Sequence, residues 1–241
     1  MKTTDTIKLR RPLDLVFLGL AVLGLLFIVQ EPSPVEAQSG AAQSQILAGL
    51  SSRYRDLGTL QATYSRVAKT PSTDQLFKSG SSQTAAGTLY WSRPDRLLLD
   101  QQAPQPEVMV TDGSTVWWHI PSEKLVYLYR NIDVAGQLKP LLAFLSGLDS
   151  LNANFDVAQA QADSTRPEQY GLLLSPKTGD GTADRLTVWC DGNFALTGFS
   201  LASVTGETTD FYFSRLTENP KLNNRLFSFK IPRGTQVIEE E

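Results

Sequence analysis

The alternation of apolar and polar positions predicts that most of this chain folds as β-strands. In "GTLYWSRPDRLLLDQ" and "KLVYLYR", residues 87–101 and 124–130, apolar side chains recur at about every second position, which is typical of strands that bury one face. The Asp112-Gly113 pair in "PEVMVTDGSTVWWHIP" predicts a hairpin turn between two such runs. Strands are expected at 59–68, 88–93, 96–102, 107–111, 115–120, 124–130, 169–175, 185–190, 195–203, 210–217 and 226–231.

Helical spacing of apolar residues is confined to two regions. Near the start, a helix over 41–57 is predicted by Ile46, Leu47, Leu50, Tyr54 and Leu57. In the middle, one or two short helices are predicted by Leu138, Leu141, Leu142, Leu145 and Leu148. So few helices cannot build alternating βαβ units, but they can cover the open side of a curved antiparallel sheet or barrel of about ten or eleven strands. We expect residues 70–86 to form a loop and the C-terminal "IEEE" to be a solvated tail.

Residues 1–37 have the layout of an export signal. Basic residues between positions 8 and 11 precede an uninterrupted apolar run from Leu15 to Val29, and a small-residue cleavage site follows at Ala37–Gln38. The run is short for a membrane-spanning helix, which needs about 20 apolar residues, so a cleaved signal is favoured over an uncleaved anchor. Both alternatives export residues 38–241, which are expected to form a single domain.

Composition and the rare residue types exclude several functions. Hydrophobic residues make up 41% of the chain and the net charge is −3, which allows a core but provides no basic surface for nucleic acid. The single cysteine, Cys190, cannot form an intramolecular disulfide or a zinc site built on several cysteines, and we expect an inert thiol. The single histidine, His119, lies in mid-strand without a nucleophile motif, which favours a structural role. We therefore expect no enzyme, no metal site and no cofactor.

One part of the strand ladder combines apolar residues with an arginine. Alternation places Leu89, Trp91 and Arg93 on one face of a strand. To the same face of the following strands we assign Leu97, Leu99, Met109 and Trp117. These apolar residues form either the ordinary core of a barrel or the lining of a cavity. Arg93 either lies on this face, where it must be hydrogen-bonded, or lies in water at the rim of the sheet.

Several segments resemble the periplasmic outer-membrane lipoprotein carrier family, LolA. "GTLYWSRPDRLLLD" is similar to the G-x-L-x-x-x-R-P strand pair of that family, "PEVMVTDGSTVWWHIP" to its hairpin, and "FSFKIPRGTQVIEEE" to its closing segment. With "QATYSRV" near the start, the resemblance covers about residues 43–239. Residues 134–154 match in apolar character more than in letters, and Leu99 stands where an aromatic residue often follows the R-P pair. The absence of a cysteine near the cleavage site agrees with a soluble carrier rather than with a lipoprotein receptor.

The resemblance implies a fold and a function. The fold would be mainly β, an incomplete antiparallel β-barrel of about eleven strands with a strongly curved sheet and a lid of two to three short α-helices. The protein would be a monomeric periplasmic carrier that binds the acyl chains of lipoproteins in an apolar cavity. It would accept them from an inner-membrane ABC-type lipoprotein-releasing transporter and pass them to an outer-membrane lipoprotein receptor. The alternative is a lipid- or envelope-stress-sensing periplasmic binding protein of the same fold.

The resemblance also implies roles for individual residues. The cavity would be lined by Leu89, Trp91, Leu97, Leu99, Met109 and Trp117. The lid would carry Leu138, Leu141, Leu142, Phe144 and Leu145. Arg93 would be the lid latch, and we expect it to donate hydrogen bonds to backbone carbonyls between positions 135 and 150.

Overall fold

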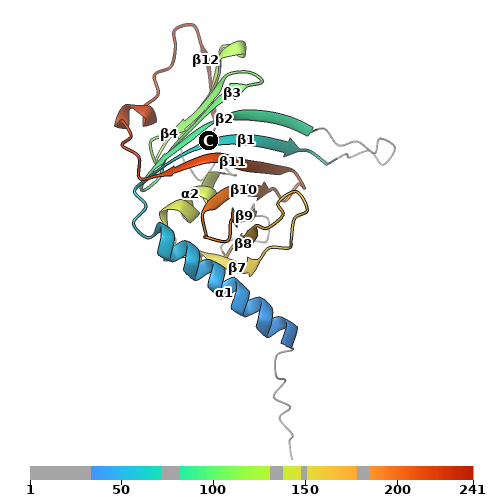
Figure 1. Ribbon diagram of the computed structural model, residues 1–241. Helices are drawn as coiled ribbons and strands as arrows, with labels where there is room; N and C mark the ends of the chain where they lie inside the picture. The colour runs from blue at the N-terminus through green and yellow to red at the C-terminus, as the bar shows by residue number, and fades with distance from the viewer. Residues whose placement is uncertain (1–33, 72–81, 131–137, 148–150, 178–184, 241) are drawn as a thin grey trace, which may run out of the picture. The chain divides into compact units, whose positions relative to one another are not determined.

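In a computed structural model, which describes residues 34–71, 82–130, 138–147, 151–177 and 185–240, the strands join in one twelve-stranded sheet (Figure 1). The strands are β1 (Thr59–Lys69), β2 (Ser82–Ser92), β3 (Arg96–Ala103), β4 (Glu107–Thr111), β5 (Val116–Ile120), β6 (Leu125–Tyr129), β7 (Phe155–Gln159), β8 (Tyr170–Pro176), β9 (Arg185–Cys190), β10 (Leu196–Ala202), β11 (Thr208–Glu218) and β12 (Gln236–Glu240). Their order in the sheet is β12-β6-β5-β4-β3-β2-β1-β11-β10-β9-β8-β7. Neighbouring strands are antiparallel except β12 and β6, which are parallel.

The described helical segments are α1 (Pro34–Tyr54), η1 (Pro121–Glu123), α2 (Leu138–Ser146), α3 (Leu151–Asn154) and η4 (Asn224–Phe227). Helix α1 packs beside β7 and β8, and α2 packs against β9 (Figure 1). The prediction of short helices in the middle of the chain is confirmed. Helix α1 begins before the predicted 41–57 span and ends at Tyr54, ahead of the turn into β1. Among the described residues, no helix is long and apolar enough to cross a membrane.

Helix α1 is fixed to the sheet by its apolar stripe and by two polar contacts. Ile46, Leu50 and Tyr54, which share one face of the helix, are at most 4% exposed. The Tyr54 hydroxyl accepts a hydrogen bond of 2.8 Å from the backbone N–H of Leu196, and burial raises the pKa of Tyr54 to about 12. Gln43 Nε2 donates to the carbonyl oxygen of Val157 in the edge strand β7 at 2.9 Å. The helix therefore satisfies part of an open sheet edge.

The two faces of the sheet carry different apolar clusters. One face, called the inner face from here on, contributes to a large cluster shared with α1 and α2 that includes Leu60, Leu89, Trp91, Leu97, Val116 and Phe199. The outer face carries a smaller cluster around Leu98, Val110 and Phe227. Leu97 and Leu98 separate in this way because successive residues of a strand project to opposite faces. Residues 222–229 supply the cover of the outer cluster.

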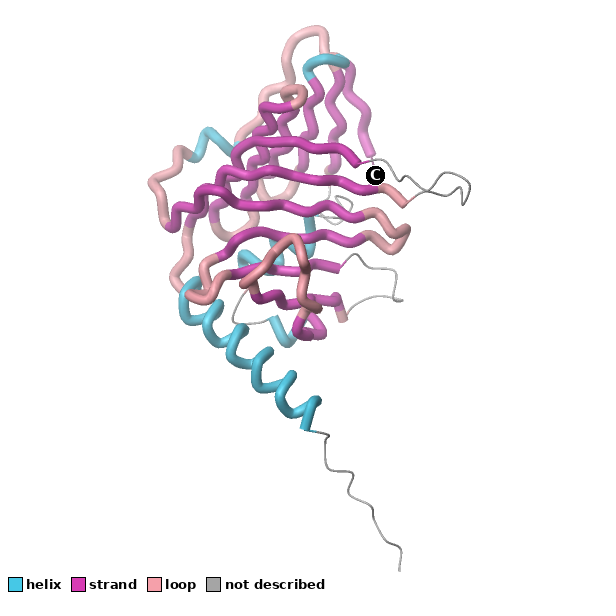
Figure 2. Tube along the Cα trace, turned by 45° about the vertical axis from the view of Figure 1, so that its right-hand side comes forward, coloured by secondary structure: helices cyan, strands magenta, loops and turns pink. Residues whose placement is uncertain are grey.

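The predicted fold class is confirmed in outline and corrected in one respect. The fold is mainly β, with an open and largely antiparallel sheet and few short helices. The predicted strong curvature is wrong, because the sheet is not strongly curled and its edge strands β12 and β7 do not pair with each other. Figure 2 shows the strands in magenta as one open sheet, and α1 and α2 contribute buried apolar side chains to the cluster on its inner face.

Three local predictions near strand ends are also wrong. Strand β2 begins at Ser82, inside the segment predicted as a loop over 70–86. The predicted strand at 226–231 is replaced by the 3-10 helix η4 and extended chain. Residues 238–240 of the C-terminal "IEEE" are not a free tail but part of β12, where Glu239 forms a 2.9 Å ion pair with Arg130, the residue that follows β6. Parallel pairing with a distant strand leaves no local signature in an acidic sequence.

Candidate functional site

Helix α2 lies on the inner face with its apolar side chains buried. Its side chains that are at most 3% exposed are Leu141, Leu142, Phe144 and Leu145. All belong to the same cluster as Leu89 and Trp91 of β2. The ring of Phe144 meets the ring of Phe199 on β10 edge-on, with 6.1 Å between centroids. Leu138 opens α2, but its side chain lies outside the described residues. The segment predicted as a lid thus covers an apolar surface.

The end of α2 is fastened to the turn between β2 and β3. This turn, residues 93–95, is called the RPD turn from here on. The Ser146 hydroxyl, in the last residue of α2, contacts both the Pro94 carbonyl oxygen and Asp95 Oδ1, the latter at 3.0 Å. A hydroxyl has a single proton to donate, so these two acceptors share it. This polar contact joins the end of α2 to the RPD turn.

Arg93 lies at the rim of the sheet and is exposed. Its backbone N–H donates to the Gly58 carbonyl oxygen at 2.9 Å, and its Nε donates to the Leu57 carbonyl oxygen at 3.0 Å. Both acceptors belong to the connection between α1 and β1. The sequence allowed Arg93 either on the apolar face or at the rim of the sheet, and the structure places it at the rim. Part of the stretch expected to hold the acceptors, residues 135–137 and 148–150, lies outside the described residues, so a bond from Arg93 to it stays a prediction.

Five of the six residues assigned to the cavity face lie on the inner face. Leu89, Trp91 and Leu97 are at most 1% exposed within the inner cluster. Leu99 and Met109 are half-buried and pack against it. The indole N–H of Trp91 is buried and has no hydrogen-bond partner among the described residues. These residues therefore form a continuous apolar surface, and their role as a lining for a ligand stays a prediction.

The placement of Trp117 is wrong. The β4–β5 register pairs Met109 with Trp118 and Val110 with Trp117, so Trp117 projects from the outer face. There its ring lies 6.4 Å from the ring of Phe229. Trp118 occupies the inner position beside Met109. Adjacent tryptophans give the same alternation signal in either register, and a shift of one residue reverses every side chain.

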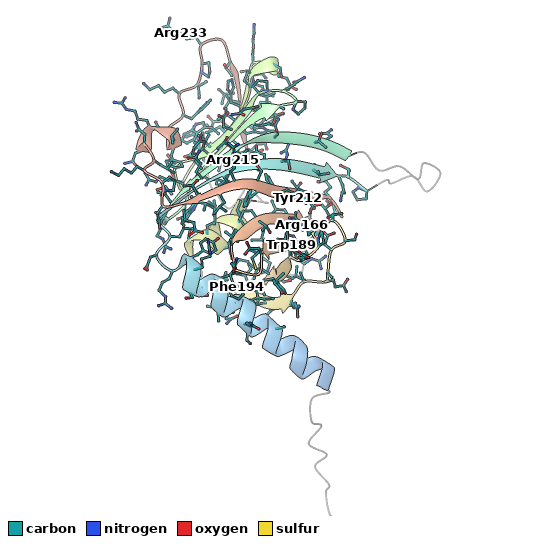
Figure 3. The ribbon with its side chains drawn as sticks, in the orientation of Figure 1. Arg166, Trp189, Phe194, Tyr212, Arg215 and Arg233 are labelled. Carbon is teal, nitrogen blue, oxygen red and sulfur yellow. The ribbon has the colours of Figure 1, made fainter. Side chains whose placement is uncertain are left out.

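A buried arginine on the outer face was not singled out by the sequence. The Arg166 side chain is fully buried between two aromatic rings (Figure 3), with its guanidinium 3.9 Å from the Tyr212 ring centroid and 5.2 Å from that of Trp189. Its Nη2 donates to the Phe211 carbonyl oxygen at 3.2 Å and lies 3.8 Å from Asp210 Oδ1. Burial lowers the pKa of this guanidinium, and the negative charges around it oppose the shift.

Arg166 fastens the connection between β7 and β8 to the outer face. This connection, residues 160–169, lies over β9, β10 and β11, whose outer-face residues include Trp189, Ser200 and Asp210. Trp189 Nε1 donates to Ser200 Oγ at 2.8 Å, and Ser200 donates in turn to Asp210. No local signal could have revealed this cluster, because a loop arginine beside a proline is usually exposed.

The rare residues have structural positions. His119 lies on the outer face with its ring 5.5 Å from the ring of Phe229. Cys190 is fully buried, and burial raises the pKa of its thiol to about 11, so the thiol stays protonated at neutral pH. Within the described ranges, His, Cys, Asp and Glu residues form no group of three that could hold a metal ion.

Sequence comparison shows the family to which this open sheet with a covered apolar face belongs. Residues 69–230 match the family described as "Outer membrane lipoprotein carrier protein LolA". The match spans more than half of the chain, and the chain belongs to the LolA family of outer-membrane lipoprotein carriers. Members of this family are periplasmic transport proteins without enzymatic activity.

Curated relatives support the assignment over most of the chain. All three cited here carry the name outer-membrane lipoprotein carrier protein. The protein of Azotobacter vinelandii is 28% identical over 183 residues, which cover 76% of this chain and 82% of the relative. That of Hahella chejuensis is 28% identical over 211 residues, covering 86% and 95%. That of Dechloromonas aromatica is 30% identical over 161 residues, covering 66% and 73%.

Proposed function

We propose that the inner face binds the acyl chains of lipoproteins and that the protein shuttles them from the inner to the outer membrane. The observation that supports this proposal most strongly is α2, whose buried apolar side chains cover the apolar surface around Leu89, Trp91 and Leu97. Acyl chains can replace these side chains, since each methylene removed from water contributes about 0.8 kcal/mol. Lipoproteins are the cargo of the family to which the chain belongs.

The RPD turn is the latch of this device in our proposal. It accepts from Ser146 at the end of α2, and through Arg93 it donates to the Leu57 carbonyl oxygen beside α1. The turn thus links the two helices that cover the inner face. A latch of a few hydrogen bonds stabilises the closed form against cargo, which lowers the affinity for cargo and permits release.

The route of the cargo is part of the same proposal. Residues 1–37 direct export, and residues 38–241 form the carrier domain in the periplasm. There the protein accepts lipoproteins from an inner-membrane ABC-type transporter and passes them to an outer-membrane receptor. No membrane insertion of the carrier domain is required, because the covered inner face shields the acyl chains from water.

A release assay tests the proposal. The purified chain is incubated with inner-membrane vesicles that contain an acylated lipoprotein and the ABC-type transporter, with ATP. We expect the lipoprotein to leave the vesicles as a soluble complex with one carrier molecule, and native mass spectrometry should detect the acylated mass. An unacylated form of the same lipoprotein is the control. Equal release of the two forms, or no release of either, would contradict acyl-chain binding.

Arg93→Leu tests the latch separately. If the arginine holds the cover closed, the variant retains bound lipoprotein and transfers it more slowly to the outer-membrane acceptor. Arg215→Leu is the matched control, because Arg215 is exposed on β11 and pairs with Thr63 on the outer side (Figure 3). If Arg93→Leu transfers lipoprotein at the wild-type rate, Arg93 is not part of the latch.

A further inference from the structure

The charged side chain of Arg66 lies on the inner face of the sheet, next to the apolar cluster. Along β1, Leu60, Ala62 and Tyr64 are buried in the inner cluster, and alternation places Arg66 on the same face. The register agrees, because Arg66 lies opposite Phe211 of β11, another residue of the inner cluster. A surface that only packed against hydrocarbon would have no use for a guanidinium.

Small residues make room for this arginine. Arg66 Nη2 donates to Gln101 Oε1 on β3 at 2.9 Å, although β2 lies between the two strands. Strand β2 contributes Ala85, which is paired with Arg66, and Gly87 beside Gln101. A Cβ atom at Gly87 would lie 2.2 Å from the Asp100 carbonyl oxygen, so no larger residue fits there. The arginine can therefore lie across β2 and reach β3.

Gln101 is oriented towards Arg66, but the described residues do not fill all of the hydrogen-bond donors of the guanidinium. Gln101 is 6% exposed, and its Nε2 donates to the Gln105 carbonyl oxygen at 3.0 Å, which turns its Oε1 towards the arginine. On the adjacent strand, the Glu107 carboxylate accepts a 3.1 Å hydrogen bond from Trp118 Nε1. Arg66 Nε is buried and lacks a hydrogen-bond partner among the described residues. A buried donor without an acceptor is costly, which suggests that a ligand supplies the acceptor.

We propose that Arg66, held by Gln101, binds an oxygen at the polar end of an acylated ligand. The inference rests on the proposed function, because it requires acyl chains to lie on the adjoining inner face. An acyl chain in an ester or amide ends in a carbonyl oxygen, and a guanidinium is a multiple donor to such oxygens. Arg66 thereby distinguishes acylated molecules from plain hydrocarbon and sets how deep the chains enter. The oxygen belongs to the ester carbonyls of a diacylglyceryl group or to the phosphate of a phospholipid.

Binding of synthetic ligands to the full chain shows whether Arg66 binds an ester carbonyl oxygen or a phosphate oxygen. The ligands are a fluorescent diacylglyceryl lipopeptide with ester linkages, its ether-linked analogue without ester carbonyls, and phosphatidylglycerol. For Arg66→Met we expect the Kd of the ester-linked lipopeptide to rise roughly 10- to 100-fold, as for the loss of charge-assisted hydrogen bonds. The ether-linked analogue should bind the wild type more weakly, and Arg66→Met should add little further loss. A loss confined to phosphatidylglycerol assigns the oxygen to phosphate instead. Arg215→Met on the outer face is the control and should leave every Kd unchanged.

A second variant protects the test from folding effects. Arg66→Lys keeps the positive charge but lacks the Nε donor, and we expect an intermediate loss of affinity in a protein whose thermal midpoint matches the wild type. If both Arg66 variants bind all acylated ligands with wild-type affinity, Arg66 does not contact the ligand, while the proposed function stands. If the wild type binds no acylated ligand, both the inference and the proposed function fail.

Discussion

Two of the segments that cover the sheet, one on each face, are fastened in different ways. On the inner face, α2 packs through apolar side chains, and Ser146 attaches its end to the RPD turn by a polar contact. On the outer face, residues 160–169 are fixed by Arg166, which is stacked between Tyr212 and Trp189 and bonded to the backbone of β11. The first cover rests on non-directional packing, and the second on a set of directional contacts.

This difference indicates which cover can move. Apolar packing lost when α2 lifts can be regained from acyl chains, because the hydrophobic effect does not depend on the identity of the apolar partner. The contacts of Arg166 cannot be replaced in this way, since a buried guanidinium needs its own acceptors and aromatic neighbours. We therefore regard the outer cover as permanent and the inner cover as exchangeable.

The largest effect is expected from Arg166→Met. This change keeps an unbranched apolar stem but removes the cation–π contacts and leaves the buried Asp210 without its arginine partner. We expect the free energy of unfolding to fall by about 3 kcal/mol, as for other broken buried ion pairs. Urea denaturation measures it. The affinity of the folded fraction for acyl ligands should not change. Arg215→Met is the control, with an effect within about 0.5 kcal/mol. A loss for Arg166→Met as small as that of the control would show that the outer cover is loosely held.

A smaller effect is expected from Tyr54, which ties α1 to β10. Burial raises its pKa from 10.0 to about 12 in the folded protein. The neutral phenol is thus favoured by folding, so this contribution is complete below pH 10 and is lost as pH rises towards 12. Tyr54→Phe also strands the Leu196 N–H and should cost about 1–2 kcal/mol at neutral pH.

The fall of the unfolding free energy at alkaline pH, the alkaline limb of its pH dependence, tests the direction of this effect. Unfolding free energies of Tyr54→Phe should fall less steeply between pH 10 and 12 than those of the wild type. Tyr64, whose pKa burial also raises to about 12, retains its own contribution in this variant. Tyr170→Phe is the matched control, because it removes the hydroxyl of a tyrosine that is 47% exposed. Identical limbs for wild type and Tyr54→Phe would contradict the buried neutral phenol.

The smallest effects are expected from Ser146→Ala, which should lower stability and raise the affinity for ligand. Removal of the hydroxyl should lower the free energy of unfolding by about 1 kcal/mol or less. The same change should raise the affinity for an acylated lipopeptide by up to about fivefold, because the closed form that competes with ligand is weakened. Calorimetry and ligand titration on one preparation measure both quantities. A fall in affinity together with stability would indicate that Ser146 supports the ligand site rather than the latch.

The sequence predicts the features that depend on local periodicity. The hairpin at Asp112-Gly113, most strands and the apolar helix of residues 138–146 are all read from spacing within a single segment. The inner-face positions of Leu89, Trp91 and Leu97 follow from the same alternation. Such patterns are informative because a strand or helix buries a fixed face whatever its partner is.

The features that the sequence does not predict depend on distant partners. Arg93, flanked by apolar strands, lies exposed in a turn, while Arg166, in a loop rich in polar residues, is buried. Whether each arginine is buried depends on residues distant in the chain, such as Trp189 and Tyr212 around Arg166. Trp117 was misplaced because the register of the hairpin is not fixed by alternation alone. The pairing of β12 with β6 likewise joins segments that are far apart in the chain.

A reversible cross-link between α2 and the RPD turn tests the central claim most directly. Ser146 Oγ and Asp95 Oδ1 lie 3.0 Å apart, so Ser146→Cys combined with Asp95→Cys places two thiols close enough for a disulfide or for a short bismaleimide with a disulfide in its spacer, and reduction opens either bridge. The native Cys190 is buried. Binding of a fluorescent acylated lipopeptide is measured before and after reduction. If α2 must leave the inner face to admit acyl chains, the oxidised protein does not bind and the reduced protein does. Equal binding by both forms would contradict the account.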